Sequence, residues 1–141
     1  MVRLVLDTAT VVHAFRSRRG ASNRILVAVA ERRVLALASV PLFFEWEGVL
    51  KRPEHRLVHG LDLEQIDAVL ADLAAMIEPV QFDFLWRPQL RDPDDEMVLE
   101  TAVNGRADAI ITWNVRDFAQ AAPRFGIVVL SPQDALTRWP L

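Results

Sequence analysis

The 141-residue sequence contains no cysteine, which excludes a disulfide framework and every zinc or iron–sulfur site built on thiolate ligands. It also lacks any apolar stretch near the ~20 residues that span a bilayer. Residues 1–7 are too short and too charged to form a signal peptide. We therefore expect a cytoplasmic protein that has no membrane partner.

Glycine is scarce, with five residues, and no glycine-rich nucleotide-binding loop or G-x-S-x-G nucleophile motif is present. These absences exclude enzymes that depend on such a phosphate-binding loop or nucleophile turn. His55 and His59 have a spacing that suits zinc on a helix, but Pro53 precedes them and no third ligand is evident. We interpret both as surface histidines.

Lysine is nearly absent, because Lys51 is the single lysine among sixteen basic residues. Residues 1–60 carry ten basic and five acidic side chains, a net charge of +5, whereas residues 61–141 carry six and fourteen, a net charge of −8. Genomic composition is the simpler explanation of the arginine content. The alternative is that guanidinium groups bind the phosphates of a polyanion that faces an acidic site.

Short aliphatic runs alternate with segments of helical periodicity along the chain, which predicts one α/β domain over residues 1–141. Strands are expected at residues 2–6, 34–38, 76–82, 109–112 and 127–130. Pro79 argues that the third of these lies at an edge of the sheet. We therefore expect about five short parallel strands with helices on both faces.

Residues that favour helix ends mark the limits of the predicted helices. The expected N-caps are Ser22, Ser39, Asp62, Asp92, Asn114 and Ser131. Helices are expected at residues 10–16, 42–50, 92–102, 115–121 and 132–138, with two more following Ser22 and Asp62. Gly105 closely follows the helix at 92–102, as a C-terminal cap would.

Acidic residues recur at the carboxyl edge of the predicted sheet, where ligands bind in folds of this class. Asp7 ends the first strand, Glu45 lies in the helix after the second, and Asp117 follows the fourth. Asp92, Asp94 and Asp95 open the helix before the fourth strand. Taken singly, most of these acids are explained as helix caps or solvated side chains.

Asp7 is the exception, because a carboxylate that completes an aliphatic strand lies near the core, where an unpaired charge is costly. Carboxylates gathered at one edge would repel one another unless a cation neutralised them. Hard oxygen ligands without cysteine or a suitable set of histidines favour Mg²⁺ or Mn²⁺. The pattern therefore predicts a divalent metal site.

Four segments of the sequence resemble the successive motifs of PIN-domain proteins. They are LDTAT at residues 6–10, PLFFEWEGVLKRPE at 41–54, RDPDDEMVLETA at 91–102 and ADAIITWNVRDF at 107–118. The similarity is strongest to VapC-like toxin components of toxin–antitoxin systems. It implies an α/β/α sandwich around a parallel sheet, metal-dependent cleavage of RNA, and inhibition by a small antitoxin protein.

The resemblance also implies roles for particular residues. The catalytic and metal-binding acids are Asp7, Glu45, Asp95 and Asp117, which would hold Mg²⁺ or Mn²⁺. The auxiliary residues are Thr8, Asp92, Thr112 and Asn114. Two positions depart from many relatives, which have asparagine at Ala9 and aspartate at Asn114.

Further residues are candidates for contacts with substrate and partners. Arg16, Arg18, Arg19 and Arg24 would bind backbone phosphates of RNA, or else form an exposed solvated loop. Phe43, Phe44 and Trp46 exceed one helix face, which suggests a homodimer interface or a groove for an antitoxin. We interpret the four tryptophans, Trp46, Trp86, Trp113 and Trp139, as core or interface residues rather than platforms for base stacking.

The leading hypothesis is therefore a metal-dependent endoribonuclease acting as a toxin. The alternative is a catalytically weak PIN-like module that binds RNA or a partner protein. The two differ in what a metal ion does, because only the enzyme requires one for RNA cleavage.

Overall fold

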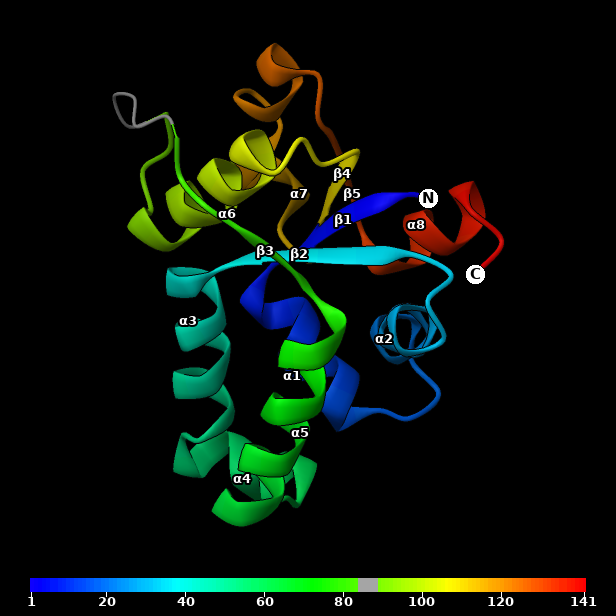
Figure 1. The fold of residues 1–141 in the computed structure, drawn as a ribbon, viewed down its shortest axis with the longest axis vertical. Coiled ribbons are helices and arrows are strands. Elements are labelled where there is room, and N and C mark those ends of the chain that lie inside the picture. Colours follow the sequence, from blue (N-terminus) through cyan, green and yellow to red (C-terminus); the bar gives the residue numbers. More distant parts are fainter. Residues whose placement is uncertain (84–88) are drawn as a thin grey trace.

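The protein is described by a computed structural model that covers residues 1–83 and 89–141. Its centre is a parallel five-stranded sheet with the order β3-β2-β1-β4-β5 (Figure 1). The strands are β1 (Arg3–Leu6), β2 (Leu35–Ser39), β3 (Glu78–Val80), β4 (Ala109–Ile111) and β5 (Val128–Leu130). The parallel sheet and the edge position of β3 are as predicted.

Helices cover both faces of this sheet, which confirms the expected three-layer α/β/α fold. The helices of the N-terminal half are α1 (Thr8–Arg16), α2 (Ala21–Ala30), α3 (Val40–Leu50), α4 (Pro53–His59) and α5 (Leu63–Met76). Those of the C-terminal half are α6 (Pro93–Asn104), α7 (Val115–Phe118), η1 (Ala122–Phe125) and α8 (Pro132–Arg138). In Figure 1, α6 and α7 lie on one side of the sheet, and α1, α2, α3 and α5 lie on the other.

Several predicted helix caps form hydrogen bonds with the expected geometry. The side chains of Ser39, Asp62, Asp92 and Ser131 each accept from a backbone N–H in the first turn of the helix that follows. Asp7 does the same at the start of α1, so this helix begins two residues earlier than predicted. The cap therefore also fixes the side chain of a candidate catalytic acid.

Two predicted caps behave differently. The N-cap of α2 is Gly20, and Ser22 lies buried within the first turn, because the chain already turns into the helix before Ser22. Asn114 precedes α7 as expected, but its side chain makes no capping bond. Its backbone N–H donates instead to the hydroxyl of Thr112 at 2.9 Å, so threonine rather than asparagine shapes this turn.

Two short elements were not expected from the sequence. No helix is predicted between the one at residues 42–50 and Asp62, whereas α4 begins at Pro53, because proline is well suited to the first turn of a helix. The segment predicted as one helix over 115–121 ends at Phe118, and the η1 turn follows from Ala122. Short helices lack the periodicity that would reveal them.

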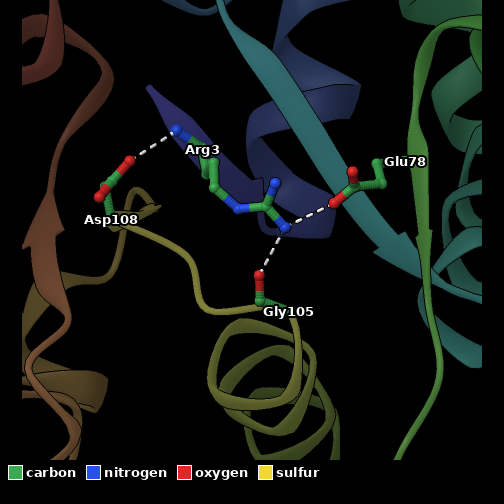
Figure 2. A network of polar contacts seen from close by, with 4 residues as sticks. All are labelled: Arg3, Glu78, Gly105 and Asp108. Atoms are coloured by element: carbon green, nitrogen blue, oxygen red, sulfur yellow. Dashed lines mark hydrogen bonds and ion pairs between the residues drawn. The ribbon is translucent and has the colours of Figure 1, made fainter. Parts of the chain in front are cut away.

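The amino edge of the sheet is held by a charged network around Arg3 (Figure 2). Its guanidinium donates to Glu78 Oε2 at 2.5 Å and to the carbonyl of Gly105 at 2.7 Å. Its backbone N–H donates to Asp108 Oδ2 at 2.8 Å. The network joins β1 to β3 and to the segment between α6 and β4, at the edge opposite the candidate acids.

Gly105 ends α6 in a space too small for a side chain. A Cβ atom there would lie 2.8 Å from a methyl group of Val80 and 2.9 Å from the carbonyl of Thr101. The predicted cap is thus confirmed for a different reason, since its backbone is right-handed and close packing demands the glycine.

Within residues 1–83 and 89–141, none of the helices combines the length and apolar character required to cross a bilayer.

Candidate functional site

The side chain of Asp7 is anchored where β1 and β4 end together. Leu6 pairs with Ile111, so Asp7 and Thr112 leave the sheet side by side. Asp7 Oδ2 accepts from the Thr112 hydroxyl at 2.5 Å, and Oδ1 accepts from the backbone N–H of Thr10 at 2.9 Å. Both carboxylate oxygens are therefore held before any ligand binds.

Burial opposes the charge of Asp7, whose residue is only 7% exposed. Desolvation raises the pKa of this carboxyl group, while the hydrogen bonds from Thr112 and Thr10 lower it. Asp7 is therefore a carboxyl group held near the core by hydrogen bonds from Thr112 and Thr10. Such a group is costly for stability unless a cation or a strong donor compensates it.

Asp95 is the residue that connects the candidate acids. It lies half-buried in the first turn of α6. Its pKa is raised to about 6, first by burial and then by the negative charges of Asp92, Asp117, Asp7 and Asp94. The fold therefore brings the end of β1, the start of α6 and α7 into electrostatic contact, although they are distant in the sequence.

Glu45 lies half-buried on α3 and faces a different part of the acidic cluster. Its pKa is raised to about 7 by burial, by the charge and hydrogen bond of Asp94, and by the charge of Asp92. Arg52 opposes this rise. Glu45 is thus paired with Asp94, a residue that was noted among the acids of α6 but not assigned a role.

Asp117 is exposed on α7 and lines a cleft of about 460 Å³ together with Asp92 and Asp95. The remaining lining residues are Gln89, Leu90, Arg91, Arg116 and Gln120. Acids and guanidinium groups therefore meet in one open cleft. An anionic chain can bind in this cleft only if part of the negative charge of the cleft's acids is neutralised.

The acidic site, defined as Asp7, Glu45, Asp95 and Asp117, fits a hard divalent cation by its donor chemistry. All four donors are carboxylates, and the pKa values of Glu45 and Asp95 are raised first by burial and then by the negative charge of neighbouring acids. Within residues 1–83 and 89–141, however, no three carboxylate or histidine side chains lie close enough to hold one ion. A metal would therefore have to draw Glu45, Asp95 and Asp117 together around the fixed Asp7.

The predicted auxiliary residues take separate positions around Asp7. Thr112 donates to Asp7 directly, and Asn114 is tied to Thr112 through its backbone. Thr8 begins α1 and lines a pocket beside Asp7. Asp92 caps α6, where its Oδ1 accepts from the backbone N–H of Asp94 at 2.8 Å, and it also lines the cleft.

The structure separates the four candidate arginines. Arg16 ends α1 and donates from Nη2 to His55 Nδ1 at 2.9 Å, beside the pocket that Thr8 lines. Arg18 and Arg19 are exposed in the turn between α1 and α2. Arg24 approaches the carbonyl of Leu141 at 3.4 Å. Arg16 is thus the candidate that borders a pocket next to Asp7.

Glu96 is a polar residue at the cleft that sequence reasoning did not single out. It is 7% exposed, and its Oε2 accepts from the backbone N–H groups of Gln89 and Leu90 at 2.9 and 2.7 Å. Glu96 therefore fixes two residues that line the cleft. A third acid after Asp94 and Asp95 was the available signal, but acids in a first helical turn are common for other reasons.

The aromatic candidates do not share one environment. Trp46 is buried in the core, whereas Phe44 beside it on α3 is 61% exposed. Trp113 is 50% exposed next to Thr112, so of the two predicted settings, core or interface, the core is excluded. Trp139 is half-buried, with the Arg138 guanidinium over its ring. Trp86 lies outside the residues that the structure describes.

Comparison with known proteins agrees with this architecture. A family model described as PIN domain matches residues 3–116 of the chain. A solved structure of VapBC2 from Rickettsia felis, bound to a DNA fragment from their promoter, contains a similar chain with a TM-score of 0.62. The alignment covers 91% of this chain and 97% of that chain at 16% identity, so the likeness concerns the fold. No curated protein matches the sequence.

Proposed function

Because the chain belongs to the PIN domain family, we propose that it is a metal-dependent endoribonuclease that hydrolyses RNA phosphodiester bonds. The observation that carries the proposal is the electrostatic coupling of Asp95 to Asp7, Asp92, Asp94 and Asp117. Carboxylates from distant segments raise one another's proton affinity at the edge where this fold class binds ligands. Structural acids elsewhere on a surface have no reason to converge in this way.

Asp7, Glu45, Asp95 and Asp117 are the residues that would hold Mg²⁺ or Mn²⁺. A bound divalent cation supplies Lewis acidity, which favours ionisation of water and stabilises charge on phosphoryl oxygens. The protein's own part is positional. Thr112 and Thr10 fix the carboxylate of Asp7, and Asp95 and Glu45 become fully charged when a cation offsets their neighbours.

We further propose that the protein, acting as one domain in the cytoplasm, is the toxin of a toxin–antitoxin pair. The structurally similar chain comes from a VapBC2 complex, which supports an antitoxin partner. Phe44 and Val40 are 61% and 64% exposed on the same helix, α3, one turn apart. This apolar face is the proposed contact of a second copy in a homodimer or of a small antitoxin protein.

The alternative function is a catalytically weak module that binds RNA or protein. One observation favours it: no three acids of the described residues lie close enough to hold an ion, and Glu45 faces Asp94 rather than Asp7. The alternative predicts that RNA or partner affinity persists when the acids are neutralised, and that RNA is not cut with any divalent ion.

The decisive experiment measures cleavage of single-stranded RNA with Mg²⁺, with Mn²⁺ and with EDTA. Asp7→Asn and Asp95→Asn should abolish metal-dependent cleavage, because each removes a charge that the cation needs. Asp134→Asn, on the exposed first turn of α8, is the matched control and should cleave as the wild type does. Equal cleavage by all four proteins would contradict the proposal, provided that thermal melting shows each to be folded.

A further inference from the structure

Trp113 is an exposed aromatic residue placed directly beside the acidic site. Half of its surface is accessible, although an indole ring gains more than most side chains from burial. Its neighbour in the chain, Thr112, donates a hydrogen bond to Asp7. The ring therefore lies one residue away from a side chain that anchors the acidic site.

A second ring lies against Trp113. The centroid of His13, on α1, is 4.8 Å from that of Trp113, and the two rings are inclined by 44°. Burial and the charge of Arg16 lower the pKa of His13, while the charge of Asp7 opposes this. We call Trp113 and His13 the aromatic platform. It joins α1 to the turn after β4, the two segments that also meet at Asp7.

His13 also lines the pocket beside Asp7, which we call the side pocket. This hollow of about 260 Å³ is lined by Thr8, Ala9, Val12, His13, Arg16, Val49 and His55. It is smaller than the roughly 300–1,000 Å³ of pockets that hold drug-sized ligands, so it suits one small planar or phosphate-bearing unit. Thr8 directly follows Asp7, which places one end of the hollow at the acidic site.

A positive charge is positioned at this side pocket. Arg16 Nη2 donates to His55 Nδ1 at 2.9 Å, which orients the guanidinium from α4. Among the described residues, no carboxylate forms an ion pair with Arg16. Guanidinium has five N–H donors, so most of them stay available for the oxygens of a phosphate group.

We propose that the aromatic platform stacks a base of single-stranded RNA and that Arg16 binds a phosphate of the same strand. The inference rests on the proposed ribonuclease function and deepens it by assigning a nucleotide-binding subsite next to the acidic site. Single-stranded RNA presents unstacked bases, which bind aromatic side chains, and phosphates, which bind arginine. The juxtaposition of an exposed tryptophan, a histidine ring against it and an arginine that forms no ion pair among the described residues supplies both contacts.

Binding of a short fluorescently labelled single-stranded RNA, measured by anisotropy in EDTA, separates this subsite from cleavage. Trp113→Ala should weaken binding by about 5- to 150-fold, the effect of losing one base–aromatic stack. Trp113→Phe should retain most of the affinity. Trp139→Ala removes the same side chain from the opposite edge of the sheet and should bind as the wild type does.

The phosphate contact has its own signature in the salt dependence of binding. Arg16→Gln should reduce the slope of log affinity against log salt concentration by about 0.7, the value for one phosphate contact on a single strand. Arg138→Gln, on the exposed end of α8, should leave the slope unchanged. A slope that Arg16→Gln does not alter would overturn this half of the proposal.

Tryptophan fluorescence provides a test that does not depend on the alanine variant folding. RNA should quench part of the wild-type emission, and this change should disappear in Trp113→Phe. Unchanged quenching, or wild-type RNA affinity in Trp113→Ala, would overturn the stacking subsite, including the case in which Trp113 contacts a partner protein instead. If the wild type still cleaves RNA, only the subsite fails; if it neither binds nor cleaves RNA, the proposed function fails as well.

Discussion

Replacing Thr112 with valine removes the hydroxyl that joins the sheet edge to the acidic site. This hydroxyl donates to Asp7 Oδ2 at 2.5 Å and accepts from the backbone N–H of Asn114 at 2.9 Å. Thr112 is fully buried, so water cannot easily replace it. A hydrogen bond to a charged group contributes roughly 1.5–3 kcal/mol and a neutral one roughly 0.5–1.5 kcal/mol. We expect Thr112→Val to lower the free energy of unfolding by about 2–4 kcal/mol at neutral pH.

Urea denaturation in EDTA measures this loss, and a double-mutant cycle with Asp7→Asn assigns it. Asparagine keeps the shape of the side chain but removes its charge, so Thr112→Val should cost about 1–2 kcal/mol less in that background. The exposed hydroxyl of Thr137 donates only to a helix carbonyl, at 3.2 Å. Thr137→Val is therefore the control, with an expected change below about 0.5 kcal/mol.

The same substitution should affect RNA cleavage, because Asp7 loses the donor that fixes one of its oxygens. Thr112→Ser keeps the hydroxyl and should restore most of the stability and activity. An equal cost of Thr112→Val with and without the Asp7 charge would refute the reasoning. It would mean that the hydroxyl serves only the turn at Asn114 and does not act through the carboxylate.

Three other predictions concern the cleft and the sheet edges. Gly105→Ala should lower stability by about 1–3 kcal/mol through overpacking, whereas Gly48→Ala, which has open space around it, should not; urea denaturation compares them. The pKa of Asp95 is raised to about 6 in the folded chain, so the native state binds its proton more tightly than the unfolded state does. Stability in EDTA should therefore rise as the pH falls from about 8 to about 4, by about 1 kcal/mol after solvent screening, and this slope should flatten in Asp95→Asn. Glu96→Gln should speed amide exchange at residues 89–90, because it weakens the charged acceptor of both backbone N–H groups.

Most of the fold could be predicted because its strands are nearly continuous aliphatic runs. The run at residues 109–112 presents apolar side chains to both faces of the sheet, so helices are expected on either side of a parallel sheet. Elements without such a pattern were missed. The helix α4 and the η1 turn are short and contain few buried residues, so neither periodicity nor composition distinguished them from loops.

The acids at the site could be predicted as a set, but their pairing could not. Asp7 was identifiable because an acid completing a buried strand has few structural explanations. Which acids approach one another depends on how α3 and α6 meet at the carboxyl edge of the sheet, and this is a property of side-chain packing. The sequence therefore did not reveal that Glu45 faces Asp94.

The position of Trp113 also depends on tertiary packing that the sequence alone does not show. Tryptophan is buried more often than not, so the sequence favours a core or interface position. The turn after β4 instead turns the residue towards α1, where His13 covers only part of the ring. Whether an aromatic residue fills the core or remains exposed depends on tertiary contacts that a single sequence does not display.

The two edges of the sheet differ in a way that bears on function. At the amino edge, Arg3 pairs with Glu78, and Asp108 accepts from the backbone of Arg3, so each charge has a partner (Figure 2). At the carboxyl edge, burial raises the pKa values of Asp95 and Glu45, and neighbouring charges of the same sign raise them further. A fold that needed only stability would compensate both edges. The uncompensated edge is therefore where binding of a cation would return the most stability to the protein, and melting with and without Mg²⁺ or Mn²⁺ should show a rise that Asp95→Asn reduces.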